Sequence, residues 1–235
     1  MASDNDYSGS FKYAVDIIFC IDVTGSMGPV IEAVKENVRS FHSLLDSAMA
    51  EKEKAISQLR VRVIAYRDFA DNPSNAIELT GFLTLPGRTG EFESFVQRLR
   101  ATGGGDEPES GLEALSLAID SDWERGQDRR RHVIALFTDA SAHPLGDAAA
   151  RGVSTYPPSV PATLDELFER WGYPSSQSAT MENSAKRLLL FAPDTTPWNL
   201  IAADWNNTIF LPSKAGEGLE EVEMQEIINA IANSI

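Results

Sequence analysis

"VDIIFCIDVTGSMGPVIEAV", residues 15–34, is the stretch that decides the fold. Its first half is an apolar run, which is typical of a central parallel strand covered on both faces. Its second half begins a series of apolar residues spaced three and four apart, which predicts an amphipathic helix. Between the halves stand Asp22, Thr24 and Ser26. In a sheet of parallel strands, these polar residues lie where ligands bind.

The rest of the chain also alternates short apolar runs with amphipathic segments, which predicts βαβ units and an α/β fold. The run at residues 77–85 follows the preceding strand too closely for a crossover helix, so it should pair antiparallel at an edge. We therefore predict a six-stranded, mostly parallel sheet with one antiparallel edge strand and helices on both faces. The expected strands are residues 14–21, 59–66, 77–85, 132–138, 187–192 and 208–212.

Four amphipathic segments are expected to cover the sheet as helices. The first begins at Gly28 and keeps its apolar spacing as far as Leu45, as one helix. The others are residues 90–99, residues 109–119 and the segment from Leu219 onward. Residues 1–12 are expected to form a flexible N-terminal segment, and residues 13–235 a single domain.

Composition narrows the classes of function. With 43% hydrophobic residues in 235, the chain can bury a sizeable core. The net charge of −15 repels phosphate backbones and anionic lipid, so nucleic acid and membrane surfaces are not expected as partners. Cys20 is the only cysteine, and no apolar run approaches the roughly 20 residues that span a bilayer. The polar start lacks a signal-peptide pattern, and we expect a cytoplasmic protein.

Acidic and hydroxyl residues recur where the predicted parallel strands end. We name the first loop (residues 22–27, "DVTGSM"), the second loop (102–110, "TGGGDEPES") and the third loop (136–143, "LFTDASAH"). Because the carboxyl ends of parallel strands meet at one edge, the three loops should converge there. Oxygen donors suit a hard cation such as Mg²⁺, whereas zinc would require His or Cys. The pattern therefore predicts a divalent-metal site.

These three loops resemble those of the metal-ion-dependent adhesion site in von Willebrand factor type A (vWA) domains. The resemblance covers residues 13–235 and implies a Rossmann-like fold. Together with "AYRDF" and "TDASAH", the loops are more similar to the intracellular branch of the family, which includes domains fused to atypical kinases, than to integrin-type domains. The resemblance implies a domain that binds a protein partner and is not an enzyme.

The family pattern is Asp-x-Ser/Thr-x-Ser in the first loop, Thr in the second and Asp in the third. The first and third loops match it, but the usual threonine position of the second falls on Asp106, with Thr102 as a nearby hydroxyl alternative. The metal is expected to be Mg²⁺, with Mn²⁺ or Ca²⁺ as alternatives. The metal ligands implied by the resemblance are Asp22, Thr24, Ser26, Asp106 and Asp139.

In the family, an acidic side chain of the partner completes the coordination of the metal. Here three carboxylates would place three negative charges beside two positive ones, which strengthens metal binding and weakens attraction for an acidic partner. Two features could relieve this excess of negative charge: Asp106 could bind through a water, or Arg67 could neutralise part of the charge. Arg67 and Asp68 are otherwise interpreted as a structural pair.

Other interpretations of the same residues remain open. The polar residues of the first loop could merely cap the following helix, and Asp106 could cap the next one. The alternative function is a metal-dependent phosphatase or hydrolase on the same acidic edge. A haloacid dehalogenase mechanism would need a second Asp as general acid, and Thr24 stands there instead.

A long segment without convincing periodicity, residues 140–161, begins directly after Asp139 and includes the end of the third loop. Segments of this length without regular structure are uncommon in compact domains and are often functional. Tyr156, Pro157 and Pro158 offer an aromatic ring and a stiff backbone that could anchor a partner. The alternative is a solvated insertion without a role.

Overall fold

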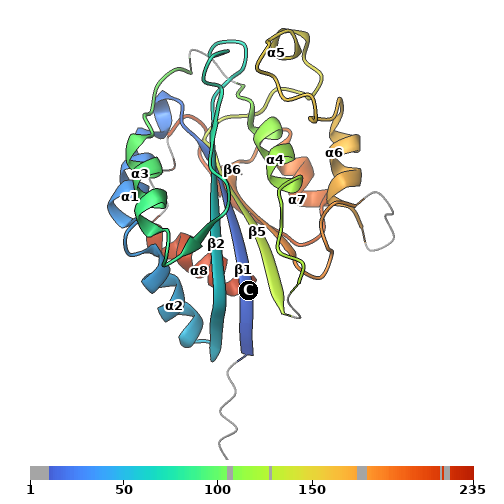
Figure 1. Cartoon of the computed structure of the whole chain (residues 1–235). Helices are drawn as coiled ribbons and strands as arrows, with labels where there is room; N and C mark the ends of the chain where they lie inside the picture. The colour runs from blue at the N-terminus through green and yellow to red at the C-terminus, as the bar shows by residue number, and fades with distance from the viewer. Residues whose placement is uncertain (1–10, 105–107, 127–128, 174–178, 218, 220–222) are drawn as a thin grey trace, which may run out of the picture.

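The computed structural model describes residues 11–104, 108–126, 129–173, 179–217, 219 and 223–235. Within them lies a seven-stranded sheet of order β3-β2-β1-β5-β6-β7, in which β4 also pairs with β2 (Figure 1). The pairs β1–β2, β1–β5, β5–β6 and β6–β7 are parallel, while β3 and β4 run antiparallel to β2. The predicted α/β class is confirmed. The strands are β1 (Phe11–Asp22), β2 (Lys54–Tyr66), β3 (Ile77–Leu79), β4 (Leu83–Leu85), β5 (Arg130–Phe137), β6 (Lys186–Pro193) and β7 (Thr208–Ser213).

The sheet has seven strands where six were predicted, and the extra strand lies at the antiparallel edge. The predicted strand at residues 77–85 is divided into β3 and β4, because one extra residue separates them relative to their partners on β2. At the break, the amide of Thr80 donates to the carbonyl of Val63, and the amide of Val63 donates to the hydroxyl of Thr80, both at 3.0 Å. A threonine side chain thus replaces a backbone carbonyl in the ladder. The antiparallel direction was predicted correctly, and the bulge was not.

The helix predicted from Gly28 is divided as well. In the structure α1 (Gly28–Asn37) ends before α2 (Phe41–Ala50) begins. The side chains of Asn37 and Ser40 donate to backbone carbonyls of the preceding turn, which competes with a continuous helix. None of the helices in the described part of the chain combines the length and apolarity needed to cross a membrane. The others are η1 (Gly25–Met27), α3 (Thr89–Arg98), α4 (Gly111–Ile119), α5 (Ala148–Arg151), α6 (Leu164–Trp171), α7 (Trp198–Asp204) and α8 (Met224–Ser234).

The sheet is covered on both faces, as predicted. Helices α1, α2, α3 and α8 lie over one face, and α4, α6 and α7 over the other (Figure 1). Successive side chains of β1 point to opposite faces, so Ile17 and Phe19 enter the first core while Ile18 and Cys20 enter the second. Because β1 lies between β2 and β5, the first loop leaves the sheet near its middle, between the loops that follow its two neighbours.

Candidate metal site

Asp22 is the last residue of β1 and is fully buried. Its Oδ1 accepts hydrogen bonds from the amide (2.9 Å) and the hydroxyl (2.6 Å) of Thr24, and its Oδ2 accepts one from the hydroxyl of Thr138 (2.7 Å). Burial raises the pKa of Asp22 to about 6, although these hydrogen bonds favour the carboxylate. A buried carboxylate surrounded by hydroxyl groups would gain stability from a nearby cation.

The first and third loops leave the sheet side by side. The last residue pair of β1 and β5 is Ile21 with Phe137, and Asp139 follows two residues later, almost completely buried. The exposed Ser26 donates from its hydroxyl to Oδ1 of Asp139 at 3.0 Å, across 113 residues of sequence. The structure therefore brings the four predicted residues of these two loops together, with Asp22 and Thr24 on one side and Ser26 and Asp139 on the other.

The direction of these hydrogen bonds bears on metal binding. A hydroxyl has one proton and two acceptor lone pairs. Thr24 and Ser26 each give that proton to a carboxylate, so their lone pairs are available to a cation or a water. Within the described residues, no three His, Cys, Asp or Glu side chains gather closely enough to hold a metal. A cation here would rest on hydroxyl oxygens and water as well as carboxylates, which fits Mg²⁺ and not zinc.

The second loop lies directly against the first. The amide of Gly25 donates to the carbonyl of Gly103 at 3.0 Å. Gly104 has a φ of +75°, and a Cβ at this position would lie only 2.9 Å from Cβ of Thr24. This close approach combined with positive φ requires glycine. The glycines of the second loop therefore hold its backbone beside Thr24.

The second loop holds two candidate ligands, Asp106 and Thr102. Asp106 lies outside the described residues. Thr102 is exposed; its amide donates to the carbonyl of Val23 (3.0 Å), and its carbonyl accepts from Nε of Arg67 (3.1 Å). The backbone of Thr102 thus fastens the second loop to the first, and the choice between the two residues as ligand stays a prediction.

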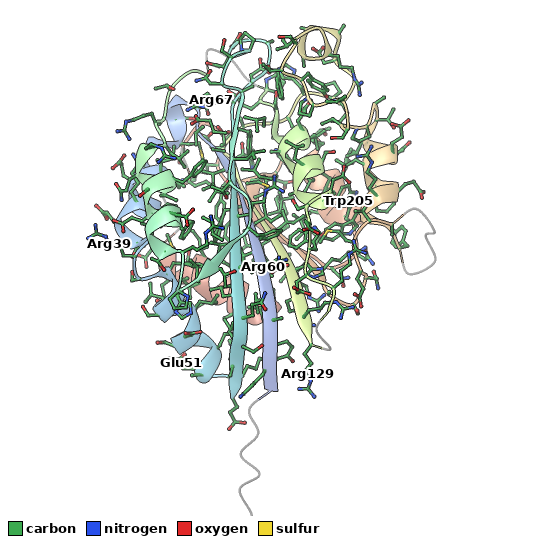
Figure 2. The ribbon with its side chains drawn as sticks, viewed as in Figure 1. Arg39, Glu51, Arg60, Arg67, Arg129 and Trp205 are labelled. Atoms are coloured by element: carbon green, nitrogen blue, oxygen red, sulfur yellow. The ribbon has the colours of Figure 1, made fainter. Side chains whose placement is uncertain are left out.

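Arg67 has a structural role, as expected, but with a different partner. It is 2% exposed and donates to the carboxylate of Glu78 (3.0 Å) and to backbone carbonyls at residues 75, 100 and 102. The predicted pairing with Asp68 is wrong. Asp68 instead accepts a hydrogen bond from the hydroxyl of Ser110 (3.1 Å) and lies 3.5 Å from Nε2 of His143. Figure 2 labels Arg67 at the upper end of the sheet.

Two residues at this edge were not among the predicted metal ligands. Thr138 bonds to Asp22, and its signal in the sequence was only its position beside Asp139. Glu109 is 3% exposed, and its Oε1 lies 3.2 Å from the position of a Cβ built on Gly104. Its amide donates to the carbonyl of Ser141, which ties the second loop to the third. The sequence placed Glu109 in the second loop at this edge, but spacing alone could not show that its side chain lies buried beside Gly104.

The long segment after the third loop also differs from expectation. Residues 140–161 contain the short helix α5, and Tyr156 is turned inward. The phenol of Tyr156 donates to Oε1 of the buried Glu113 (3.1 Å), and its ring centroid lies 5.0 Å from that of Phe69. Tyr156 is only partly buried, so its role as an anchor for a partner stays a prediction, but its phenol group already serves as donor to the buried carboxylate on α4.

The chain is similar to parts of several known proteins. A stretch of 156 residues, 66% of the chain, is 30% identical to part of the alpha-protein kinase vwkA of Dictyostelium discoideum and covers 23% of that protein. Among solved structures, the chain is similar to the pilus adhesin SpaC of Lactobacillus rhamnosus GG, with 12% identity and a TM-score of 0.49, over 94% of this chain and 30% of that one.

It is also similar to the vWF domain of the type V pili tip protein Mfa5 of Porphyromonas gingivalis, with 17% identity and a TM-score of 0.38, over 57% of this chain and 42% of that one. The match to vwkA spans less than a quarter of that relative's length. The family described as von Willebrand factor A domain matches residues 16–148, more than half of the chain. The chain therefore belongs to the von Willebrand factor A domain family.

Proposed function

We propose that this domain carries a metal-ion-dependent adhesion site that binds Mg²⁺, with Mn²⁺ or Ca²⁺ as alternatives. Its ligands would be Asp22, Thr24, Ser26 and Asp139, with Asp106 from the second loop. Two hydrogen bonds carry this proposal: the hydroxyl of Thr24 donates to the carboxylate of Asp22, and the hydroxyl of Ser26 donates to the carboxylate of Asp139. They leave hydroxyl lone pairs from one loop beside two buried carboxylates, which is a donor set for a hard cation.

We further propose that the domain binds a protein partner, and that an acidic side chain of the partner completes the coordination. A bound cation supplies a positive centre for such a carboxylate. The charge balance limits this attraction, because three aspartates would face two positive charges. Arg67 is already paired with Glu78, so it does not relieve the excess of negative charge. Coordination of Asp106 through a water remains as the way to keep the metal attractive to an acidic partner.

The metal proposal is tested by thermal unfolding of the chelator-treated protein with and without Mg²⁺. Saturating the site to a hundredfold excess over Kd should stabilise the folded state by about 2.7 kcal/mol, which corresponds to roughly 5–10 °C in a domain of this size. Asp22→Ala should abolish this rise. Asp68→Asn, which alters a buried carboxylate outside the proposed ligands, should keep it. Isothermal titration that finds no divalent ion bound to the wild-type protein would refute the site.

The setting of the domain is also a proposal. We propose that residues 13–235 form one vWA domain of the intracellular branch, in a cytoplasmic protein. The likeness to part of an alpha-protein kinase supports this branch, because the branch includes domains fused to atypical kinases. Fractionation of the native host with an antibody against the domain tests the location, and recovery mainly with the secreted or surface fraction would contradict it.

A further inference from the structure

An apolar groove of about 370 Å³ opens between α4, α7, the start of α6 and residues 142–145. The buried side chains of Leu112, Ala142 and Leu145 line its inner part, while Leu164 and Leu200 stand nearer the solvent. Leu200 is 48% exposed, which makes it one of the few large apolar side chains in the described residues that face the solvent. The described residues that line the groove are all uncharged, although the chain carries a net charge of −15.

Short contacts connect the lining of the groove to the second and third loops of the proposed metal site. Ala142 lies three residues after Asp139 and pairs with Glu109 of the second loop in a β-bridge. Nε1 of Trp198, two residues before Leu200 on α7, donates to the carbonyl of Ala140 at 2.9 Å. The end of the third loop therefore forms one wall of the groove, which places the groove a few residues along the chain from Asp139.

The chemistry of the two places is complementary. The metal site offers a positive centre to a carboxylate, whereas the groove would leave a charged group without a partner. An apolar side chain in the groove would lose water contact on most of its surface, and buried anchors of this kind contribute much of the affinity at protein interfaces. The neighbouring positions thus favour a ligand with an acidic and an apolar residue close together.

We propose that this groove receives a large apolar side chain, of the size of Leu, Met or Phe, from the same partner segment whose acidic residue binds at the metal. This inference rests on the proposed function and adds to it the chemistry of the partner. The occupant is a side chain of a protein ligand, and a second copy of this chain or a small molecule would be a different outcome of the test.

The test begins with selection of random displayed peptides on the wild-type protein in Mg²⁺. The expected consensus is an Asp or Glu followed or preceded within a few residues by a large apolar residue. A synthetic peptide of that consensus is then compared with a peptide in which Ala replaces the apolar residue. Loss of one buried Leu-sized side chain should weaken binding about tenfold to a hundredfold.

Protein variants separate the groove from the metal. Leu200→Glu should remove the advantage of the apolar peptide over its Ala version, while the thermal response to Mg²⁺ stays as in the wild type. Leu200→Met should preserve the advantage. Ile209→Glu is the matched control, because Ile209 on β7 is 40% exposed and does not line the groove.

Each outcome decides a different part of the proposal. Mg²⁺-dependent peptides with an acidic residue and no apolar preference would overturn the groove inference and leave the metal function standing. Peptides that bind equally well in chelator would overturn the coupling between groove and metal. A protein that binds neither metal nor peptide would refute the proposed function and this inference with it. Dimerisation abolished by Leu200→Glu would assign the groove to a second copy of this chain.

Discussion

Thr24 and Ser26 show how a single proton directs the chemistry of a site. Each hydroxyl donates to an aspartate that burial has removed from water, and each keeps its lone pairs available. In an isolated helix cap, a Ser or Thr side-chain oxygen would accept from a backbone amide at the start of the helix. The N-cap residues of η1 and α1, Thr24 and Met27, make no side-chain capping hydrogen bond, which disfavours the capping interpretation of Thr24 and Ser26.

The second-loop ligand is a question about one residue. If Asp106 is a ligand, directly or through one water, Asp106→Ala should weaken Mg²⁺ binding, because a hard-cation site loses an anionic oxygen. Thr102→Ala should leave metal affinity nearly unchanged, since the bonds of Thr102 to Val23 and Arg67 come from its backbone. Isothermal titration of both variants measures this. The reverse pattern would assign the usual threonine role to Thr102.

At the scale of elements, the segment of residues 140–161 supplies a hydrogen-bond donor to a buried carboxylate on helix α4. Glu113 on α4 is almost fully buried, and its Oε2 has no hydrogen-bond partner in the described structure. Burial raises its pKa to about 7, while the hydrogen bond from Tyr156 and the charge of Arg151 lower it and Asp68 raises it. The segment after the third loop thus supplies the donor that makes this buried carboxylate tolerable.

The hydrogen-bonded pair of Glu113 and Tyr156 predicts that the stability of the fold depends on pH. The pKa of Glu113 is higher in the folded state than its ordinary 4.5, so the folded state favours the protonated form. The associated stability is fully present below about pH 4.5 and is lost as the pH rises through about 7. Urea unfolding at a series of pH values should show the wild type losing on the order of 3 kcal/mol more than Glu113→Gln across this range.

Tyr156→Phe provides the matched variant for that experiment. Removing the phenol takes away a donor that favours the carboxylate, so the loss of stability should move to higher pH than in the wild type. If Glu113→Gln and the wild type have the same pH profile, burial does not perturb Glu113 as stated.

For the whole molecule, the excess of negative charge is the dominant long-range feature. Twenty Lys and Arg residues face 35 Asp and Glu, and this imbalance opposes the compact state through self-repulsion. Individual ion pairs such as Arg60 with Asp16 work in the opposite direction, but they are local. Added salt screens both, so it raises stability by weakening the repulsion and lowers stability by weakening the ion pairs.

We expect the repulsion to be the larger contribution. Raising the ionic strength from about 10 mM to about 150 mM shortens the Debye length from about 30 Å to about 8 Å, so Tm of the metal-free protein at pH 7 should rise. The same change near the isoelectric point of about 4.6 should give a smaller rise, because the net charge vanishes there. A Tm that falls with added salt at pH 7 would show that ion pairs outweigh the repulsion.

The sequence by itself determined the class of fold and the residues of the first and third loops. Apolar runs, helical spacing and polar residues at strand ends are properties of neighbours along the chain, so they can be recognised before folding. The antiparallel direction of the edge followed from the short connection between strands, which is also local. The covered β1 and the convergence of the loops at one edge of the sheet followed from these patterns.

Only the tertiary structure decided which distant groups meet. The hydrogen bond from Ser26 to Asp139, the pairing of Arg67 with Glu78 and the inward turn of Tyr156 each satisfy a buried polar group with a partner from another segment. The groove beside Leu200 likewise has walls from four parts of the chain. Such partners depend on how the helices pack on the sheet. Desolvation makes an unpaired polar group costly wherever packing buries it, so each buried group needs a partner. Spacing along the sequence does not encode which groups the packing buries together.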